Sequence, residues 1–108
     1  MALLLLAGCA TDTTAVEARR LVERGALLVD VRSPAEFAER RIPGSRNIPV
    51  EDLKKRLHEL PLEKPLVVYC HTGVRAGFAT QILRKAGYQV HNLGTISRWF
   101  YGDPSVDY

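Results

Sequence analysis

The sequence predicts a single α/β domain in which a parallel β-sheet is flanked by helices on both faces. Two short apolar runs, 27–31 and 66–69, lack the alternation of a half-exposed strand, so we expect both to be buried on both faces. Segments with helical spacing separate the apolar runs, and alternating strands and helices are typical of parallel sheets. The chain of 108 residues is long enough for one domain and too short for two.

The first predicted element is a helix that runs to about Arg24. Thr13 or Thr14 can cap its N-terminus, and Gly25 can end it, because glycine accepts the backbone conformation found after a helix. Strand 27–31 follows. Its lack of alternation places it in the interior of the sheet.

A capping box begins the second predicted helix. Ser33 stands at the N-cap, a proline follows at N1 and Glu36 stands at N3, where its side chain can return to the N-cap amide. We expect this helix to turn Phe37 inward and to end near Arg41. The segment 46–49 is then expected to form a very short strand.

The second half of the chain continues the alternation. A third helix is predicted from Glu51, with three leucines on one face, and the buried strand 66–69 follows it. The helix after it starts at Arg75 and a last strand precedes Gly94, which we expect to begin the C-terminal tail. The residues expected to face inward from the two helices are Leu53, Leu57, Leu60, Ala76, Ala79, Ile82, Leu83 and Ala86, and the last strand covers 89–93.

Residues 1–13 are expected to lie outside the domain, which we place at 14–108. The apolar run ends in Leu6-Ala7-Gly8-Cys9, which resembles a bacterial lipobox, and a polar tether follows. A secretory signal also needs a basic start and a longer apolar stretch, and neither is present. Two interpretations stay open: a periplasmic or membrane-anchored lipoprotein with a lipid on Cys9, or a cytoplasmic protein with an apolar tail. Fractionation of the full-length product would distinguish them.

The charge balance favours a small anionic substrate over nucleic acid. The chain carries 15 Lys and Arg against 12 Asp and Glu, a net charge of +3. The basic residues are dispersed and are not interleaved with aromatic residues, as a nucleic-acid surface would require. We expect a monomer.

A cysteine loop joins the strand 66–69 to the helix after it. Its six residues can curl so that successive backbone N–H groups face inward, which makes an anion-binding nest. Gly73 permits a close approach that a side chain would block, and Arg75 adds a fixed positive charge. These features favour a thiolate, so Cys70 is predicted as the catalytic nucleophile. The residues predicted to bind the substrate are His71, Thr72, Gly73, Val74 and Arg75.

Two less reactive roles for Cys70 remain open at this stage. A buried cysteine at a strand end can serve as a small hydrophobic residue, or it can form a disulfide with Cys9. The terminal position of Cys9 disfavours the disulfide. The glycine, the arginine and the flanking strand and helix favour the nucleophile. His71 is expected to point outward and to influence the choice of acceptor, rather than to act as a base.

Asp30 and Arg32 are predicted to support the cysteine loop. Asp30 stands at the carboxyl end of the strand 27–31 and Arg32 directly follows it, and the carboxyl ends of parallel strands share one edge of the sheet. A buried carboxylate needs a partner, so Asp30 is expected to hold the loop or the guanidinium of Arg75. Arg32 is expected either to bind the anionic end of the substrate or to pair with Glu36.

Three motifs in this order and spacing resemble the single-domain rhodaneses, the thiosulfate sulfurtransferase family. The resemblance covers roughly residues 14–104. It implies a rhodanese-like fold and a reaction in which Cys70 takes a sulfane sulfur, becomes a persulfide and passes the sulfur to a thiol or cyanide acceptor. It implies no metal and no organic cofactor. The motifs are Asp30-Val31-Arg32 with Glu36 and Phe37, Ile42-Pro43-Gly44-Ser45-Arg46-Asn47-Ile48-Pro49, and Cys70-x-x-Gly73-x-Arg75.

Two positions depart from the family pattern. Arg41 stands where the family often has histidine, so the resemblance does not define the rim of the pocket. Gly94-Thr95 stands where the family often has paired glycines, so the resemblance does not define the turn after the last strand.

Two other functions compete with sulfur transfer. Related folds carry phosphatase or arsenate reductase chemistry on a longer loop, with five residues between the cysteine and the arginine. Here four residues separate Cys70 from Arg75, and the tighter ring suits a single terminal sulfur. A sulfur carrier or binding module without turnover would keep the same cysteine, so the sequence does not separate it from an enzyme.

Overall fold

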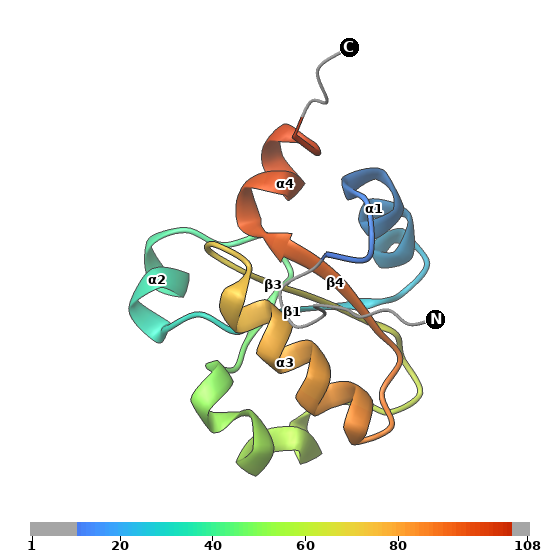
Figure 1. Ribbon diagram of the computed structural model, residues 1–108, viewed down its shortest axis with the longest axis vertical. Helices are drawn as coiled ribbons and strands as arrows, with labels where there is room; N and C mark the ends of the chain where they lie inside the picture. Colours follow the sequence, from blue (N-terminus) through green and yellow to red (C-terminus); the bar gives the residue numbers. More distant parts are fainter. Residues whose placement is uncertain (1–10, 105–108) are drawn as a thin grey trace, which may run out of the picture.

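The computed structural model describes residues 11–104 and confirms a parallel α/β fold (Figure 1). Its four strands lie in the order β2-β1-β3-β4, and every neighbouring pair is parallel. The elements in chain order are α1 (Ala15–Glu23), β1 (Leu27–Asp30), α2 (Pro34–Glu39), β2 (Arg46–Asn47), the 3₁₀ helix η2 (Val50–Glu59), β3 (Leu66–Cys70), α3 (Val74–Lys85), β4 (Val90–Thr95) and α4 (Ile96–Tyr101).

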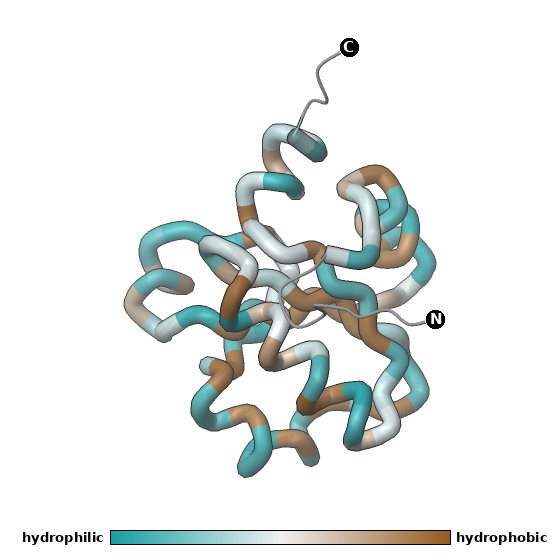
Figure 2. Tube along the Cα trace, viewed as in Figure 1, coloured by the Kyte–Doolittle hydropathy of each residue, from teal (hydrophilic) through white to brown (hydrophobic). Residues whose placement is uncertain are grey.

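Two hydrophobic cores lie on opposite faces of the sheet. The side chains of β3 alternate between them: Leu66, Val68 and Cys70 pack with residues of α3 and η2, whereas Val67 and Tyr69 pack with residues of α1 and α4. All five residues of β3 are buried, as predicted for its apolar run. Each fully buried aliphatic side chain stabilises the fold by about 1.5–3 kcal/mol. Hydrophobic residues accordingly concentrate along the central strands (Figure 2).

The caps of the first two helices are confirmed. The Thr14 hydroxyl accepts a hydrogen bond from the amide of Glu17 at the start of α1. Ser33 and Glu36 form both hydrogen bonds of the capping box at the start of α2. The prediction for Phe37 is wrong, because α2 buries no residue. This helix is only six residues long and does not pack on either core.

The helices on the other face differ in detail from the prediction. The helix expected from Glu51 is a 3₁₀ helix with a kink at Arg56, and it still buries Leu53. In α3 the predicted inward residues Ala76, Ala79 and Leu83 are buried, Ile82 is half-buried, and Ala86 is exposed. Ala86 follows the last residue of the helix, so it no longer follows the helical spacing.

The C-terminal prediction is wrong at Gly94. This glycine does not begin a tail, because β4 continues to Thr95 and the helix α4 follows directly. The pairing of β3 with β4 skips one residue: Val68 pairs with Asn92 and Tyr69 with Gly94. Gly94 has φ +89°, a left-handed conformation that glycine tolerates better than other residues.

Residues 11–13, which we expected to belong to a tether, lie against β4. The amide of Asp12 donates to the carbonyl of Asn92 at 3.0 Å, and the amide of Asn92 donates to the carboxylate of Asp12. Asp12 also forms an ion pair with Arg84 of α3. The lipobox-like segment and Cys9 lie outside the described residues, so the export hypothesis stays a prediction. None of the helices between residues 11 and 104 is long and apolar enough to cross a membrane.

Candidate active site

The candidate site lies at the carboxyl ends of the two central strands, β1 and β3. The chain goes from β1 outward to β2 and then returns to β3 on the other side of β1, so the order of strands reverses there. Asp30, the last residue of β1, pairs with Tyr69, which precedes Cys70. Ligand sites of open parallel sheets occur at such switch points. The predicted convergence of the two motifs is therefore confirmed.

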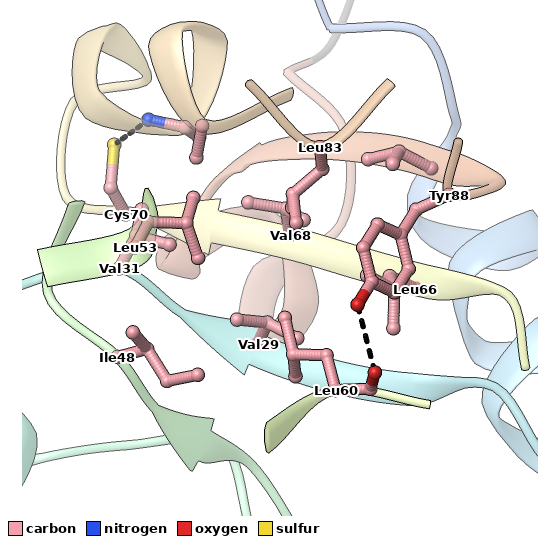
Figure 3. Close-up of a cluster of buried hydrophobic side chains, with 13 residues drawn as sticks. Val29, Val31, Ile48, Leu53, Leu60, Leu66, Val68, Cys70, Leu83 and Tyr88 are labelled. Atoms are coloured by element: carbon pink, nitrogen blue, oxygen red, sulfur yellow. Dashed lines mark hydrogen bonds between the residues drawn. The ribbon is translucent and has the colours of Figure 1, made fainter. Parts of the chain in front are cut away.

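Cys70 is a buried free cysteine whose sulfur caps the N-terminus of α3. The amide of Gly73 donates to Sγ at 3.0 Å, and the amide of Ala76 donates at 3.3 Å. The first amides of a helix have no partner inside it, and Gly73 at the N-cap has no side chain to accept them. Sγ occupies that role instead (Figure 3). Two amides and a helix N-terminus form an environment that stabilises negative charge.

The loop residues predicted to bind the substrate have different positions. His71, Thr72 and Val74 are exposed, whereas Gly73 is buried. Gly73 has φ +103°, which a residue with a Cβ adopts only with strain, and this conformation aims its amide at the sulfur. The ordered contacts of the loop with Sγ are thus made by its backbone, and three of its side chains are free to meet a ligand.

Arg75 connects the cysteine loop to α2. Its guanidinium donates to both carboxylate oxygens of Glu36, at 2.8 and 3.0 Å. The hydrogen bonds from Arg75, together with those from Ser33, hold the pKa of Glu36 well below its usual range. Arg75 is therefore a paired cation that fixes the loop against a neighbouring helix.

Asp30 and Arg32 form a separate, buried ion pair. The guanidinium of Arg32 donates to the carboxylate of Asp30 at distances down to 2.7 Å, and the Arg32 amide also donates to it. Each residue had two expected roles, and the pairing alternative is wrong in both cases, because Asp30 pairs with Arg32 and Glu36 pairs with Arg75. Residues two apart after a strand can fold back on each other, and this leaves Glu36 for Arg75.

Asn47 of β2 also supports the turn that follows β1. Its side-chain amide donates to the carbonyls of Asp30 and Arg32, both at 3.0 Å. The turn before β2 is anchored by Tyr69, whose hydroxyl contacts the Ile42 amide and the Ser45 hydroxyl. Burial raises the pKa of Tyr69 to about 12, so the phenol stays neutral.

Replacement of Glu36 by glutamine should lower the free energy of unfolding by about 1 kcal/mol at pH 7, because a half-exposed ion pair is lost. The pKa of Glu36 is depressed in the folded state, so its stabilising effect is complete above the unfolded value of about 4.3 and declines as the pH falls below it. The difference between wild type and Glu36→Gln in urea unfolding should therefore shrink from pH 7 to pH 3. Glu39→Gln on the same helix is the control, and a difference that grew with acid would contradict the pairing.

A pocket of about 480 Å³ lies beside the loop. Arg32 and Glu36 are already paired with other residues, as described above. Arg40 forms no ion pair with any described carboxylate; its guanidinium lies 4.4 Å from the centre of the Phe100 ring. The pocket therefore offers to a ligand the cation of Arg40, the imidazole of His71 and the carboxylate of Glu39, which forms none of the described ion pairs. The lining residues are Arg32, Glu36, Glu39, Arg40, His71 and Ile96.

Within residues 11–104, no group of three or more His, Cys, Asp or Glu side chains is placed to hold a metal ion. The chemistry available at the site is that of a thiol held by amides next to a charged pocket.

Several functional contacts were missed by the sequence analysis. The amide of Ala76 could have been inferred, because the third residue of a helix always has a free N–H. The role of Glu36 as the partner of Arg75 and that of Arg40 in the pocket depend on where α2 lies. These contacts join residues far apart in the chain, and no local signal marks them.

A cysteine in a strand–loop–helix turn, with its sulfur held by helix amides at the switch point of a parallel sheet, defines a class of α/β domains built around such a cysteine loop. Residues 14–100 match the rhodanese-like domain family. The chain belongs to this family, as its three motifs indicated.

Three relatives illustrate the similarity. The chain is 46% identical to YqhL of Bacillus subtilis over 78 residues, which are 70% of this chain and 62% of that protein. It is 38% identical over 72 residues to the thiosulfate sulfurtransferase GlpE of Pseudomonas syringae, covering 67% of this chain and 68% of the other. The structure of the human single-domain sulfurtransferase TSTD1 superposes with a TM-score of 0.75 at 34% identity, over 84% of this chain and 95% of that one. The chain thus spans less than two thirds of YqhL.

Proposed function

We propose that this protein is a sulfurtransferase that moves a sulfane sulfur from a small anionic donor to a thiol or cyanide acceptor through a persulfide on Cys70. The observation that carries the proposal is the contact of Sγ with two backbone amides at the N-terminus of α3. The names of the relatives GlpE and TSTD1 support the same reaction class.

The reaction has two steps that balance without an added oxidant. With thiosulfate, the Cys70 thiolate attacks the outer sulfur, the sulfur–sulfur bond of the donor breaks, and sulfite leaves with the bonding electron pair. The acceptor then attacks the terminal sulfur of the persulfide, and the thiolate of Cys70 is regenerated. A persulfide is itself an anion, so the same helix N-terminus stabilises the intermediate.

Within the pocket beside the loop, Arg40 is the residue that can bind an anionic donor, and Glu39 is a carboxylate of the same lining. Arg40 supplies a positive charge that no described carboxylate neutralises, and His71 lies next to the nucleophile. The buried pair of Asp30 and Arg32 holds the neighbouring turn in place. The four residues between Cys70 and Arg75 make a small ring, which fits one sulfur better than three phosphate oxygens.

The test is to expose the full chain to thiosulfate and to measure its mass and its turnover. We expect Cys70 to gain the mass of one sulfur atom and to lose it again when cyanide or a thiol is added, with repeated turnover. A stable persulfide without turnover would instead identify a sulfur carrier. Hydrolysis of a phenyl phosphate ester without any reaction with thiosulfate would reject the proposal in favour of a phosphatase.

A further inference from the structure

An exposed apolar stripe runs along α3 away from the cysteine loop. Val74 and Phe78 are 47% and 56% exposed, and Ile82 is half-buried on the same face, because residues four apart are neighbours on a helix. Val74 directly follows Gly73, whose amide contacts Sγ. We call these three residues the α3 stripe. It begins at the site of the proposed sulfur chemistry.

The α3 stripe ends in a groove between α3 and η2. The groove has a volume of about 370 Å³ and is lined by Lys54 and Leu57 of η2 and by Gln81, Ile82, Lys85 and Ala86. No carboxylate lines it. Its lining combines three apolar side chains with two lysines.

The two lysines carry unneutralised charge. Every ion pair in the part of the chain that the structure describes uses an arginine, so neither Lys54 nor Lys85 is paired there. A ligand that covers the groove would have to supply apolar groups in the middle and carboxylates at the sides. Electrostatic complementarity of this kind selects partners and speeds their association.

The length of this surface suits a short helix. From Val74 to Lys85 the axis of α3 rises about 16 Å, or roughly three turns. Single exposed apolar residues are ordinary, as Val16 on α1 shows, but a contiguous patch beside an active site is typical of a docking surface.

We propose that the α3 stripe and the groove bind an acidic, amphipathic segment of a partner protein that exchanges sulfur with Cys70. The partner's apolar residues would cover Phe78 and Ile82, its carboxylates would meet Lys54 and Lys85, and its cysteine would lie near Val74 at the mouth of the loop. The sulfur exchange rests on the proposed function, whereas the docking itself does not.

The binding test uses a synthetic helical peptide of 18 residues with one leucine stripe, flanking glutamates and a serine in place of the cysteine. A matched peptide carries lysines instead of glutamates. Fluorescence anisotropy with the full chain should show binding of the acidic peptide at least about fivefold tighter than that of the basic one. Phe78→Gln and Lys85→Glu should each weaken it by about fivefold or more, the effect of losing roughly 1 kcal/mol.

Two matched variants control for general effects. Val16→Gln removes an apolar residue that is 57% exposed on the opposite face, and Lys64→Glu reverses an exposed lysine in another loop. Both should leave the dissociation constant unchanged. Equal binding of the two peptides, or equal loss in the control variants, would overturn the proposal. A dimer in sedimentation equilibrium that is lost in Phe78→Gln, together with no preference for the acidic peptide, would also overturn the proposal. The α3 stripe would then bind a second copy of the chain.

The outcome can be separated from the proposed function. Phe78→Gln and Lys85→Glu should keep wild-type turnover of thiosulfate with cyanide, and should raise the KM only for a peptide that carries the cysteine. If the acidic peptide binds as expected but no thiosulfate is consumed, the docking surface stands and the sulfurtransferase proposal fails. If turnover is normal and the Phe78 variant binds peptide as wild type does, only the docking proposal is rejected.

Discussion

Cys70→Ser should lower sulfur transfer from thiosulfate at least about 10³-fold, the scale of loss seen when a covalent nucleophile is removed. A serine alkoxide is far harder to form than a thiolate, and serine cannot carry a persulfide. The fold should survive, because the serine oxygen can still accept hydrogen bonds from the amides of Gly73 and Ala76, which contact Sγ in the wild type. Steady-state rates with cyanide as acceptor, together with a thermal melt of each protein, provide the measurement.

Cys9→Ser is the matched control for this change. Cys9 precedes the residues that match the family, so its loss should leave the rate of the domain unaltered. Sulfur transfer that persisted in Cys70→Ser would place the nucleophile elsewhere. An equal loss in Cys9→Ser would point to a role for the second cysteine that nothing in the described residues requires.

Gly94→Ala should destabilise the domain by about 2–3 kcal/mol. A Cβ at this position meets two obstacles: the φ of +89° strains any L side chain, and the new methyl would overlap the side-chain methyl of Thr11. Movement of Thr11 to relieve the overlap would disturb the hydrogen bonds between Asp12 and Asn92. At about 4–8 °C per kcal/mol, the melting temperature should fall by about 10 °C or more.

Two variants separate the two causes. Gly102→Ala has a similar φ of +86° with nothing within 4 Å of the new Cβ, so it should show the backbone strain alone. Thr11→Ala combined with Gly94→Ala should recover the part due to overlap, because the contacts that remain, with Thr11 Cβ at 3.7 Å and Arg98 Cδ at 4.0 Å, are ordinary van der Waals distances. Equal melting temperatures for Gly94→Ala and Gly102→Ala would show that the overlap with Thr11 has no measurable cost.

Local sequence alone predicted the elements that depend on neighbours three or four residues apart. The caps of Thr14 and Ser33 follow from hydrogen bonds within one helical turn, and the burial of β3 follows from its apolar run. The cysteine loop belongs to this group, because a strand, a glycine and a helix N-terminus in succession are enough to direct amides at Sγ.

The end of β4 was mispredicted because a glycine in the sequence can either end a strand or lie within one. Gly94 was interpreted as a break, yet pairing with β3 continues through it to Thr95. Glycine within a strand often marks a close approach of another segment, and here that segment is Thr11. A contact across more than eighty residues has no signature in the residues around the glycine.

The arrangement of charges around Cys70 was also decided by tertiary structure. The sequence predicts that Asp30, Arg32 and Arg75 lie at one edge of the sheet, since each stands at or shortly after the carboxyl end of a parallel strand. It did not determine the pairs, because the partner of Arg75 is set by the position of α2, which brings Glu36 within 2.8 Å. Coulombic attraction alone allows any opposite charge to pair. Only the packing of the elements leaves one carboxylate within reach of each guanidinium.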